Sequence, residues 1–168
     1  MNRPSIRQVT IKSIRALDCT GSGSLSNIYS AMDYVYQNQP SGQPAVVSMS
    51  LGGGEFQIAM FESSLIYNLV KNKNIVVAVA AGNNGVPSCW TAPAFAEDAL
   101  TVGSIDPTNN QLSSFSDWGR CTDVAAPGEY VCSSIATSTT AYEELQGTSM
   151  ATPMVSGAAT LILQENPS

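Results

Sequence analysis

The spacing of hydrophobic and polar positions predicts alternating strands and helices over the first half of the chain. Residues 9–17 alternate and are rich in β-branched side chains, which predicts a strand. Residues 24–39 and 56–72 place apolar side chains three and four positions apart, which predicts two amphipathic helices. Residues 45–50 and 75–81 are short apolar runs between Gly, Pro and Asn, as expected for buried strands. This order is typical of right-handed βαβ units, so we expect an α/β fold with a parallel sheet flanked by helices.

The second half is less regular. We expect a strand over residues 100–105, a turn over residues 107–111, and a further strand with its exit over residues 124–128. After residue 149 comes a run of small and apolar residues, which predicts a buried helix with Ser149 at its start. No internal repeat or linker divides residues 1–168, so one domain is expected.

Two glycine-containing loops directly follow the predicted buried strands. The first covers residues 51–54 and the second residues 82–85. In open parallel sheets, binding sites lie at the carboxyl ends of the strands. Both loops are therefore candidates for the walls of a site.

Composition narrows the function classes. The chain has 168 residues, 43% of them apolar and 12% charged, which suits one sizeable core. A net charge of −6 argues against a nucleic-acid or anionic-membrane partner. No apolar run is long enough for a transmembrane helix, and the polar first residues lack the core of a signal peptide. Four cysteines permit disulfides, whereas the absence of histidine removes every imidazole base from this chain.

Residues 147–153 read Gly-Thr-Ser-Met-Ala-Thr-Pro. A serine at a helix start is commonly a cap, but the unpaired N–H groups there also stabilise developing negative charge. The whole string resembles the nucleophile motif of the subtilisin-like serine proteases, in the proteinase K and aqualysin group. The resemblance implies a secreted serine endopeptidase that acts on polypeptides, with Ser149 as nucleophile. Pro153 is expected in the first helical turn, where its missing N–H costs little.

Two further segments resemble parts of that family's site. Residues 77–83 resemble its oxyanion segment, which implies that the Asn83 side chain donates an N–H to the oxyanion beside the Ser149 N–H. Residues 48–54 resemble its substrate-binding strand. The substrate-binding residues implied by the resemblance are Ser50, Leu51, Gly52, Gly53, Ala81, Gly82 and Thr148.

Each of these segments also has an ordinary interpretation. Asn-Asn-Gly at residues 83–85 is a common turn signal. The glycines at positions 52–54 could cradle a phosphate, which would indicate a nucleotide-binding α/β domain. They lack the Gly-Lys-Ser/Thr ending of a P-loop and the spacing of a dinucleotide fingerprint.

The resemblance also implies a disulfide and suggests a cation site. Cys89 and Cys121 match a disulfide of aqualysin-like proteases. Cys19 matches a bridged position whose partner would lie upstream of this chain, and Cys132 has no counterpart, so we expect it to be free. Asp123 matches a carboxylate that binds calcium together with the backbone carbonyls of residues 97 and 99; alone it would be a solvated loop aspartate.

Two members of the family's catalytic triad are absent from this sequence. The triad runs Asp, His, Ser along the family's chain, and the strands and helix that carry Asp and His would precede residue 1. We therefore expect a partial subtilisin-like peptidase domain, inactive alone, whose partner is an upstream segment bearing Asp and His. The alternative is a non-catalytic relic that binds peptides or a protein partner in the same groove. Met154 stands where the family usually has a histidine that takes no part in catalysis.

Overall fold

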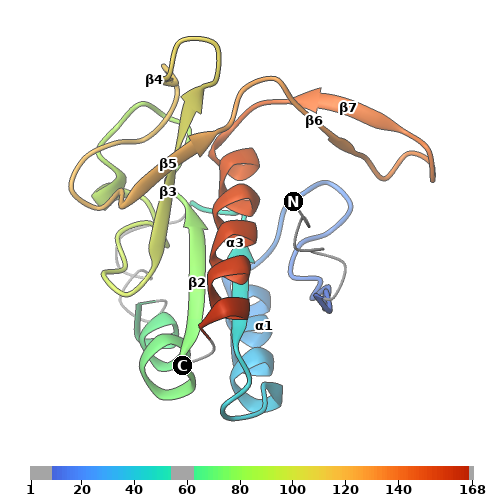
Figure 1. Ribbon diagram of the computed structural model, residues 1–168, viewed down its shortest axis with the longest axis vertical. Helices are drawn as coiled ribbons and strands as arrows, with labels where there is room; N and C mark the ends of the chain where they lie inside the picture. Colours follow the sequence, from blue (N-terminus) through green and yellow to red (C-terminus); the bar gives the residue numbers. More distant parts are fainter. Residues whose placement is uncertain (1–8, 54–62, 167–168) are drawn as a thin grey trace.

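A parallel sheet forms the centre of the computed structural model, which describes residues 9–53 and 63–166. Strands β1 (Ala45–Met49), β2 (Ile75–Ala80) and β3 (Leu100–Asp106) pair side by side in parallel. On the far side of β3, β5 (Val124–Pro127) continues the parallel sheet, and β4 (Gln111–Leu112) pairs antiparallel with the end of β3. Figure 1 shows helices packed against this sheet. The predicted α/β fold class is confirmed.

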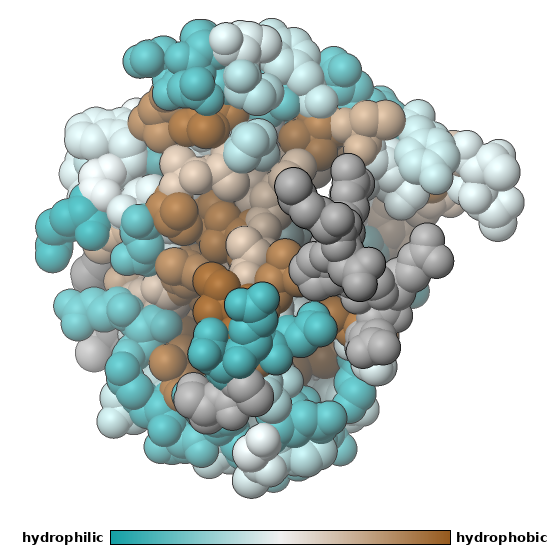
Figure 2. All heavy atoms as spheres, in the orientation of Figure 1, coloured by the Kyte–Doolittle hydropathy of each residue, from teal (hydrophilic) through white to brown (hydrophobic). Residues whose placement is uncertain are grey.

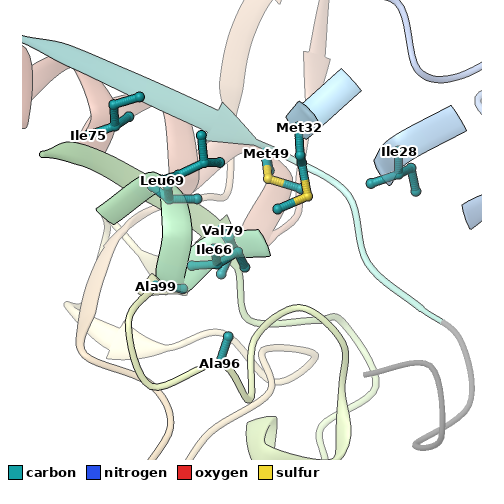
Figure 3. Packing of buried hydrophobic residues seen from close by; sticks show 10 residues of the cluster. Ile28, Met32, Met49, Ile66, Leu69, Ile75, Val79, Ala96 and Ala99 are labelled. Atoms are coloured by element: carbon teal, nitrogen blue, oxygen red, sulfur yellow. The ribbon is translucent and has the colours of Figure 1, made fainter. Parts of the chain in front are cut away.

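Helices cover both faces of the sheet. Helix α3 (Thr148–Glu165) contacts all four parallel strands on one face, and α1 (Leu25–Asn38) packs with the π-helical turn η2 (Asn68–Asn72) on the other. The larger buried cluster lies on the α1 side and is drawn in Figure 3. Its members are Ile28, Met32, Met49, Ile66, Leu69, Ile75, Val77, Val79, Ala96 and Ala99. The smaller cluster on the α3 side consists of Val102, Ala126 and Ala151.

The first predicted helix is confirmed, with α1 inside the expected range. Its N-cap Ser24 accepts a hydrogen bond from the Asn27 N–H, which satisfies one of the free donors of the first turn. Ile28 and Met32, four residues apart, turn the same face toward the sheet. The first part of the second predicted helix, residues 56–62, lies outside the described residues. Residues 63–67 are helical and run into η2.

Two expectations from the sequence are wrong, a strand at residues 9–17 and complete burial of the last helix. Residues 9–17 form no strand, and Ile11 is 88% exposed. Alternation alone does not make a strand, because the backbone needs a neighbouring edge and none of the described strands pairs with this segment. Helix α3 is not buried all round, since Met154 and Ile162 are 47% and 64% exposed. One side of α3 packs on the sheet, and no described residue covers the opposite side; Figure 2 shows hydrophobic residues gathered there.

Outside the sheet, a two-stranded antiparallel hairpin was not expected from the sequence. It consists of β6 (Val131–Ser134) and β7 (Tyr142–Leu145) and extends from the body as an arm in Figure 1. The predicted strands at residues 100–105 and 124–128 and the turn at residues 107–111 are confirmed, with β4 beginning at the last turn residue. None of the described helices combines the length and the apolar character needed to cross a membrane.

Candidate active site

Three segments that are far apart in sequence meet at one edge of the sheet. The loop after β1 carries Ser50, the loop after β2 carries Asn83, and the first turn of α3 carries Ser149. They converge because β1 and β2 are parallel neighbours, so their carboxyl ends lie at the same edge. The Ser50 and Ser149 hydroxyls each donate to the other residue's carbonyl oxygen, at 2.8 Å from Ser50 Oγ and 3.3 Å from Ser149 Oγ.

The Asn83 side chain is held in one orientation. Its Oδ1 accepts hydrogen bonds from the Thr148 N–H at 2.8 Å and from the Thr148 hydroxyl at 3.0 Å. An amide has an acceptor end and a donor end, so this contact leaves the Nδ2 donors directed away from Thr148. Thr148 is itself fully buried and immediately precedes Ser149. The geometry thus places a free amide donor beside the start of α3.

The start of α3 supplies a second donor. Gly147 precedes the helix with a φ of 146°, a conformation that side chains rarely adopt, and its N–H donates to the Gly128 carbonyl. In the first turn of a helix the N–H groups have no intrahelical acceptor. The Asn83 side chain accepts a hydrogen bond from the Thr148 N–H, whereas no acceptor among the described residues accepts one from the Ser149 N–H. Any anion beside Ser149 therefore meets a free N–H and the positive end of the helix dipole.

Pro153 lies in the second turn of α3, and the expectation of a first-turn proline is wrong. In a regular helix, the residue at this position donates its N–H to the carbonyl of Ser149, four residues earlier. Proline has no N–H, so that carbonyl is left without its helical partner. The Ser50 hydroxyl, at 2.8 Å, donates to this carbonyl instead. The missing proline N–H thus leaves the Ser149 carbonyl available for the hydrogen bond that joins the first turn of α3 to the loop after β1.

A cleft of about 690 Å³ opens at this edge of the sheet. It is lined by both predicted loops, by Thr148 and Ser149, and by a third segment, residues 21–23, that was not predicted as part of the site. The predicted site residues that line it are Ser50, Leu51, Gly52, Gly53, Gly82, Asn83, Thr148 and Ser149. Ala81 is fully buried and lies behind the cleft, where the side chain of Ala80 forms part of the wall.

The third wall is shaped by Asp18. Its carboxylate accepts from the Thr20 hydroxyl and from the N–H groups of Ser22 and Thr20, and these hydrogen bonds hold the pKa of Asp18 below its usual value. The loop thereby brings Gly21 and Gly23 to the cleft. The signal in the sequence was Asp-x-Thr followed by Gly-Ser-Gly, a pattern for a side-chain-stabilised turn.

The predicted disulfide between Cys89 and Cys121 is confirmed. Cys89 belongs to the short 3-10 helix η3 (Ser88–Trp90), which follows the Asn83 loop. Cys19 and Cys132 are both exposed and free.

Asp123 is exposed, and one of its carboxylate oxygens accepts from the Thr101 N–H at 2.8 Å. Calcium takes six to eight oxygen ligands. The described residues contain no group of three or more acidic, cysteine or histidine side chains arranged for a metal ion. Side chains of this region therefore do not build a calcium site by themselves, and most ligands would have to be backbone carbonyls and water. Calcium binding at Asp123 stays a prediction.

No side chain of the described residues that could act as a base is hydrogen-bonded to the Ser149 hydroxyl. The sequence contains no histidine, and the hydrogen bond of Ser149 Oγ goes to a neutral carbonyl. The described residues thus bring together a serine hydroxyl and two free N–H donors.

Comparisons with known proteins assign this arrangement to a family. The model of the subtilase family matches residues 6–168, so the chain belongs to the subtilase family. It is 44% identical to an extracellular serine proteinase of Thermus sp., over 95% of this chain and 37% of that protein. It is 41% identical to alkaline serine exoprotease A of Vibrio alginolyticus, over 96% of this chain and 29% of that protein.

A solved structure agrees with this assignment. A cold-adapted subtilisin-like serine proteinase superposes with a TM-score of 0.78 at 39% identity, over 91% of this chain and 53% of that one. The fold is therefore subtilisin-like and represents part of the family's domain. The chain spans about a third of the length of the Thermus sp. and Vibrio alginolyticus relatives.

Proposed function

We propose that the chain is the nucleophile-bearing part of a subtilisin-like serine endopeptidase. The observation that carries the proposal is the pairing of Asn83 Oδ1 with Thr148, which leaves the Asn83 donors free beside Ser149. Family membership supports a polypeptide substrate. The 690 Å³ cleft offers the space, and the exposed glycines of the loop after β1 let a peptide backbone approach closely.

The proposed reaction is acyl transfer to Ser149. As its Oγ bonds to the substrate carbonyl carbon, its proton passes to a base, and the carbonyl oxygen becomes negative. Asn83 Nδ2 and the Ser149 N–H stabilise that charge. The C–N bond then breaks, the amine leaves with the proton, and water later hydrolyses the ester. In this chain the base is absent, so we propose that a segment bearing Asp and His supplies it.

The exposed side of α3 supports such a partner segment. Met154 and Ile162 are exposed on α3, the helix whose first turn carries Ser149. Figure 2 shows an apolar area on this side of the molecule. The subtilisin-like neighbour has a longer chain, of which the present one covers 53%. Covering this area would remove apolar surface from water and would place further residues near the active-site turn.

A fluorophosphonate probe tests the proposal, because it reacts with serines whose proton is withdrawn by a base. We expect no labelling of the isolated chain. Labelling of Ser149 should appear when a subtilisin-like segment that bears the family's Asp and His is added. In that mixture Ser149→Ala should abolish labelling and Asn83→Ala should slow it by roughly 100-fold, the loss usual for one oxyanion donor.

The alternative is a relic that binds peptides without cleaving them. It predicts no labelling in either sample, together with saturable binding of an unstructured peptide measured by fluorescence anisotropy. Labelling of the isolated chain at a rate close to that of the mixture would contradict both versions, since the chain has no histidine. The family assignment leaves a nucleotide-binding role for the glycines after β1 without support.

Two further proposals follow from the family. We propose that the chain acts outside the cell, which is supported by the naming of the Thermus sp. relative as extracellular and by the Cys89–Cys121 disulfide. We also propose calcium binding at Asp123. Calcium should then raise the melting temperature of the wild-type chain but not that of Asp123→Asn, and an equal rise in both would contradict the site.

A further inference from the structure

Asp117 is a fully buried acidic residue to which the proposed reaction assigns no role. A buried carboxylate is costly unless it is paired or fully hydrogen-bonded. No lysine or arginine of the described segments forms an ion pair with it. Its oxygens instead accept three hydrogen bonds, from the N–H groups of Asn84 at 2.8 Å and Val86 at 3.1 Å and from the Thr91 hydroxyl at 2.8 Å. All three partners are donors, as an acceptor-only carboxylate requires.

These contacts hold the backbone on both sides of Asn83. The Asp117 N–H donates to the carbonyl of Gly82, and its carboxylate accepts from the N–H of Asn84. Asn83 therefore sits between two fixed peptide units. Its own side chain is then free to pair with Thr148. Hydrogen bonds from backbone N–H groups to a carboxylate are stronger than those to a neutral acceptor, which makes Asp117 an effective anchor.

The surroundings of Gly82 depend on the same carboxylate. A Cβ added at Gly82 would collide with Asp117 Oδ2. The glycine thus leaves the space that the carboxylate needs to reach the loop. Thr91, the third donor, also lines the cleft, and the next residue, Ala92, accepts from the Gly53 N–H. One buried side chain therefore connects the Asn83 loop with the wall formed by residues 91–92.

We propose that Asp117 is a positioning residue for the oxyanion donor, which fixes the loop on both sides of Asn83 and so the direction of its amide. This inference rests on the proposed role of Asn83. Asp117 does not line the cleft and has no hydrogen bond to Ser149, so it acts through the residues that it holds, the loop around Asn83 and Thr91.

The test uses the full 168-residue chain labelled with ¹⁵N. In the wild type, the N–H groups of Asn84 and Val86 should exchange with solvent as slowly as those of β2, although they belong to a loop. In Asp117→Ala we expect their exchange to accelerate roughly 10-fold or more, because each loses its acceptor. The side-chain amide signal of Asn83 should shift or broaden. Asp117→Asn keeps an oxygen for both N–H groups, and Thr91 can accept from the new amide, so this variant should restore the wild-type Asn83 signal.

Asp106→Ala is the matched control. The Asp106 carboxylate also accepts three hydrogen bonds, from Thr108 N–H, Thr108 hydroxyl and Asn109 amide, but at the β3–β4 turn. Its loss should leave the Asn83 signal unchanged. The inference is overturned if Asp117→Ala leaves Asn83 unmoved, if Asp106→Ala moves it equally, or if Asp117→Asn fails to restore it. Fast exchange of Asn84 and Val86 in the wild type would overturn it even without a folded variant.

The proposed roles of Asp117 and Asn83 are tested by different measurements. If Asn83→Ala labels as fast as the wild type in the complemented mixture, the proposed function falls whatever the spectra show. Unmoved Asn83 signals in Asp117→Ala would remove only the role of Asp117.

Discussion

At the scale of single residues, the site depends on which groups are left without a partner. Thr148 occupies the oxygen of Asn83, which leaves the nitrogen free. Pro153 withholds an N–H, which leaves the Ser149 carbonyl to the Ser50 hydroxyl. In the first case Thr148 satisfies the amide oxygen and leaves the amide nitrogen free, and in the second the missing N–H leaves a carbonyl that the Ser50 hydroxyl satisfies.

Gly82 gives a prediction at this scale, with Gly119 as its matched control. Both have a φ that side chains rarely adopt, 114° and 108° respectively. A Cβ at Gly119 meets open space, whereas one at Gly82 meets Asp117. Gly119→Ala should cost about 1–2 kcal/mol of unfolding free energy from backbone strain alone. Gly82→Ala should cost at least about 2 kcal/mol more, because a buried carboxylate must also move.

Urea unfolding monitored by circular dichroism measures both values. Equal losses in the two variants would show that the Asp117 contact adds nothing to backbone strain. A larger loss at Gly119 would mean that the loop after β2 is the softer of the two.

The sequence predicted Ser149 and Asn83 as candidate site residues because each lies in a contiguous string whose chemistry is local. It could not predict the contacts of Asp117 or that residues 21–23 line the cleft. Asp117 acts on N–H groups more than 30 positions away, and only the folded chain brings them together. Ser50 was predicted to contact substrate. The hydrogen bond from its hydroxyl to the Ser149 carbonyl, 99 positions away, could not be predicted from the sequence either.

At the scale of elements, the hydrophobic periodicity predicted the helix and the strands that form the core. It failed for segments whose secondary structure depends on contacts with distant parts of the chain. Helix α1 and strands β1, β2 and β3 were found because they bury apolar side chains, whereas in β5 only Ala126 is buried. The segment 9–17 has the pattern of a strand but no described neighbour to pair with. Strands β6 and β7 were missed because they are largely exposed and show no apolar alternation.

The disulfide gives a prediction at the element scale. Cys89 and Cys121 tie the turn η3 to the segment that precedes β5, across 32 positions. In the chain-entropy view, closing such a loop stabilises the fold by about 3–4 kcal/mol. The double variant Cys89→Ser with Cys121→Ser should lose about that amount in urea unfolding under oxidising conditions. The matched control replaces the two free, exposed cysteines, Cys19 and Cys132, and should lose less than about 0.5 kcal/mol.

Reduction supplies an independent check. Adding a thiol reductant should destabilise the wild type by the same amount and leave the Cys89/Cys121 variant unaffected. If the wild type does not respond, the bridge contributes nothing to the free energy of unfolding.

At the scale of the whole molecule, the two faces of the sheet are unequally covered. Among the described residues, ten buried ones form the cluster on the α1 side, whereas three form that on the α3 side. The outer side of α3 is exposed in the described structure and carries the apolar area of Figure 2. Exposed apolar patches of this kind associate with other surfaces, which include further copies of the same chain.

Replacing Ile162 by lysine tests what this area does. The side chain is 64% exposed, so Ile162→Lys should change the free energy of unfolding by less than about 0.5 kcal/mol. Sedimentation should nevertheless show less self-association, because the charge must be desolvated in any apolar contact.

The same variant should weaken complementation by the Asp- and His-bearing segment, seen as a higher segment concentration at half-maximal labelling of Ser149. Tyr34→Lys on α1, 53% exposed on the opposite face, adds the same charge and should do neither. If Tyr34→Lys reduces association equally, net charge rather than the α3 surface controls it; if Ile162→Lys leaves complementation intact, the segment binds elsewhere.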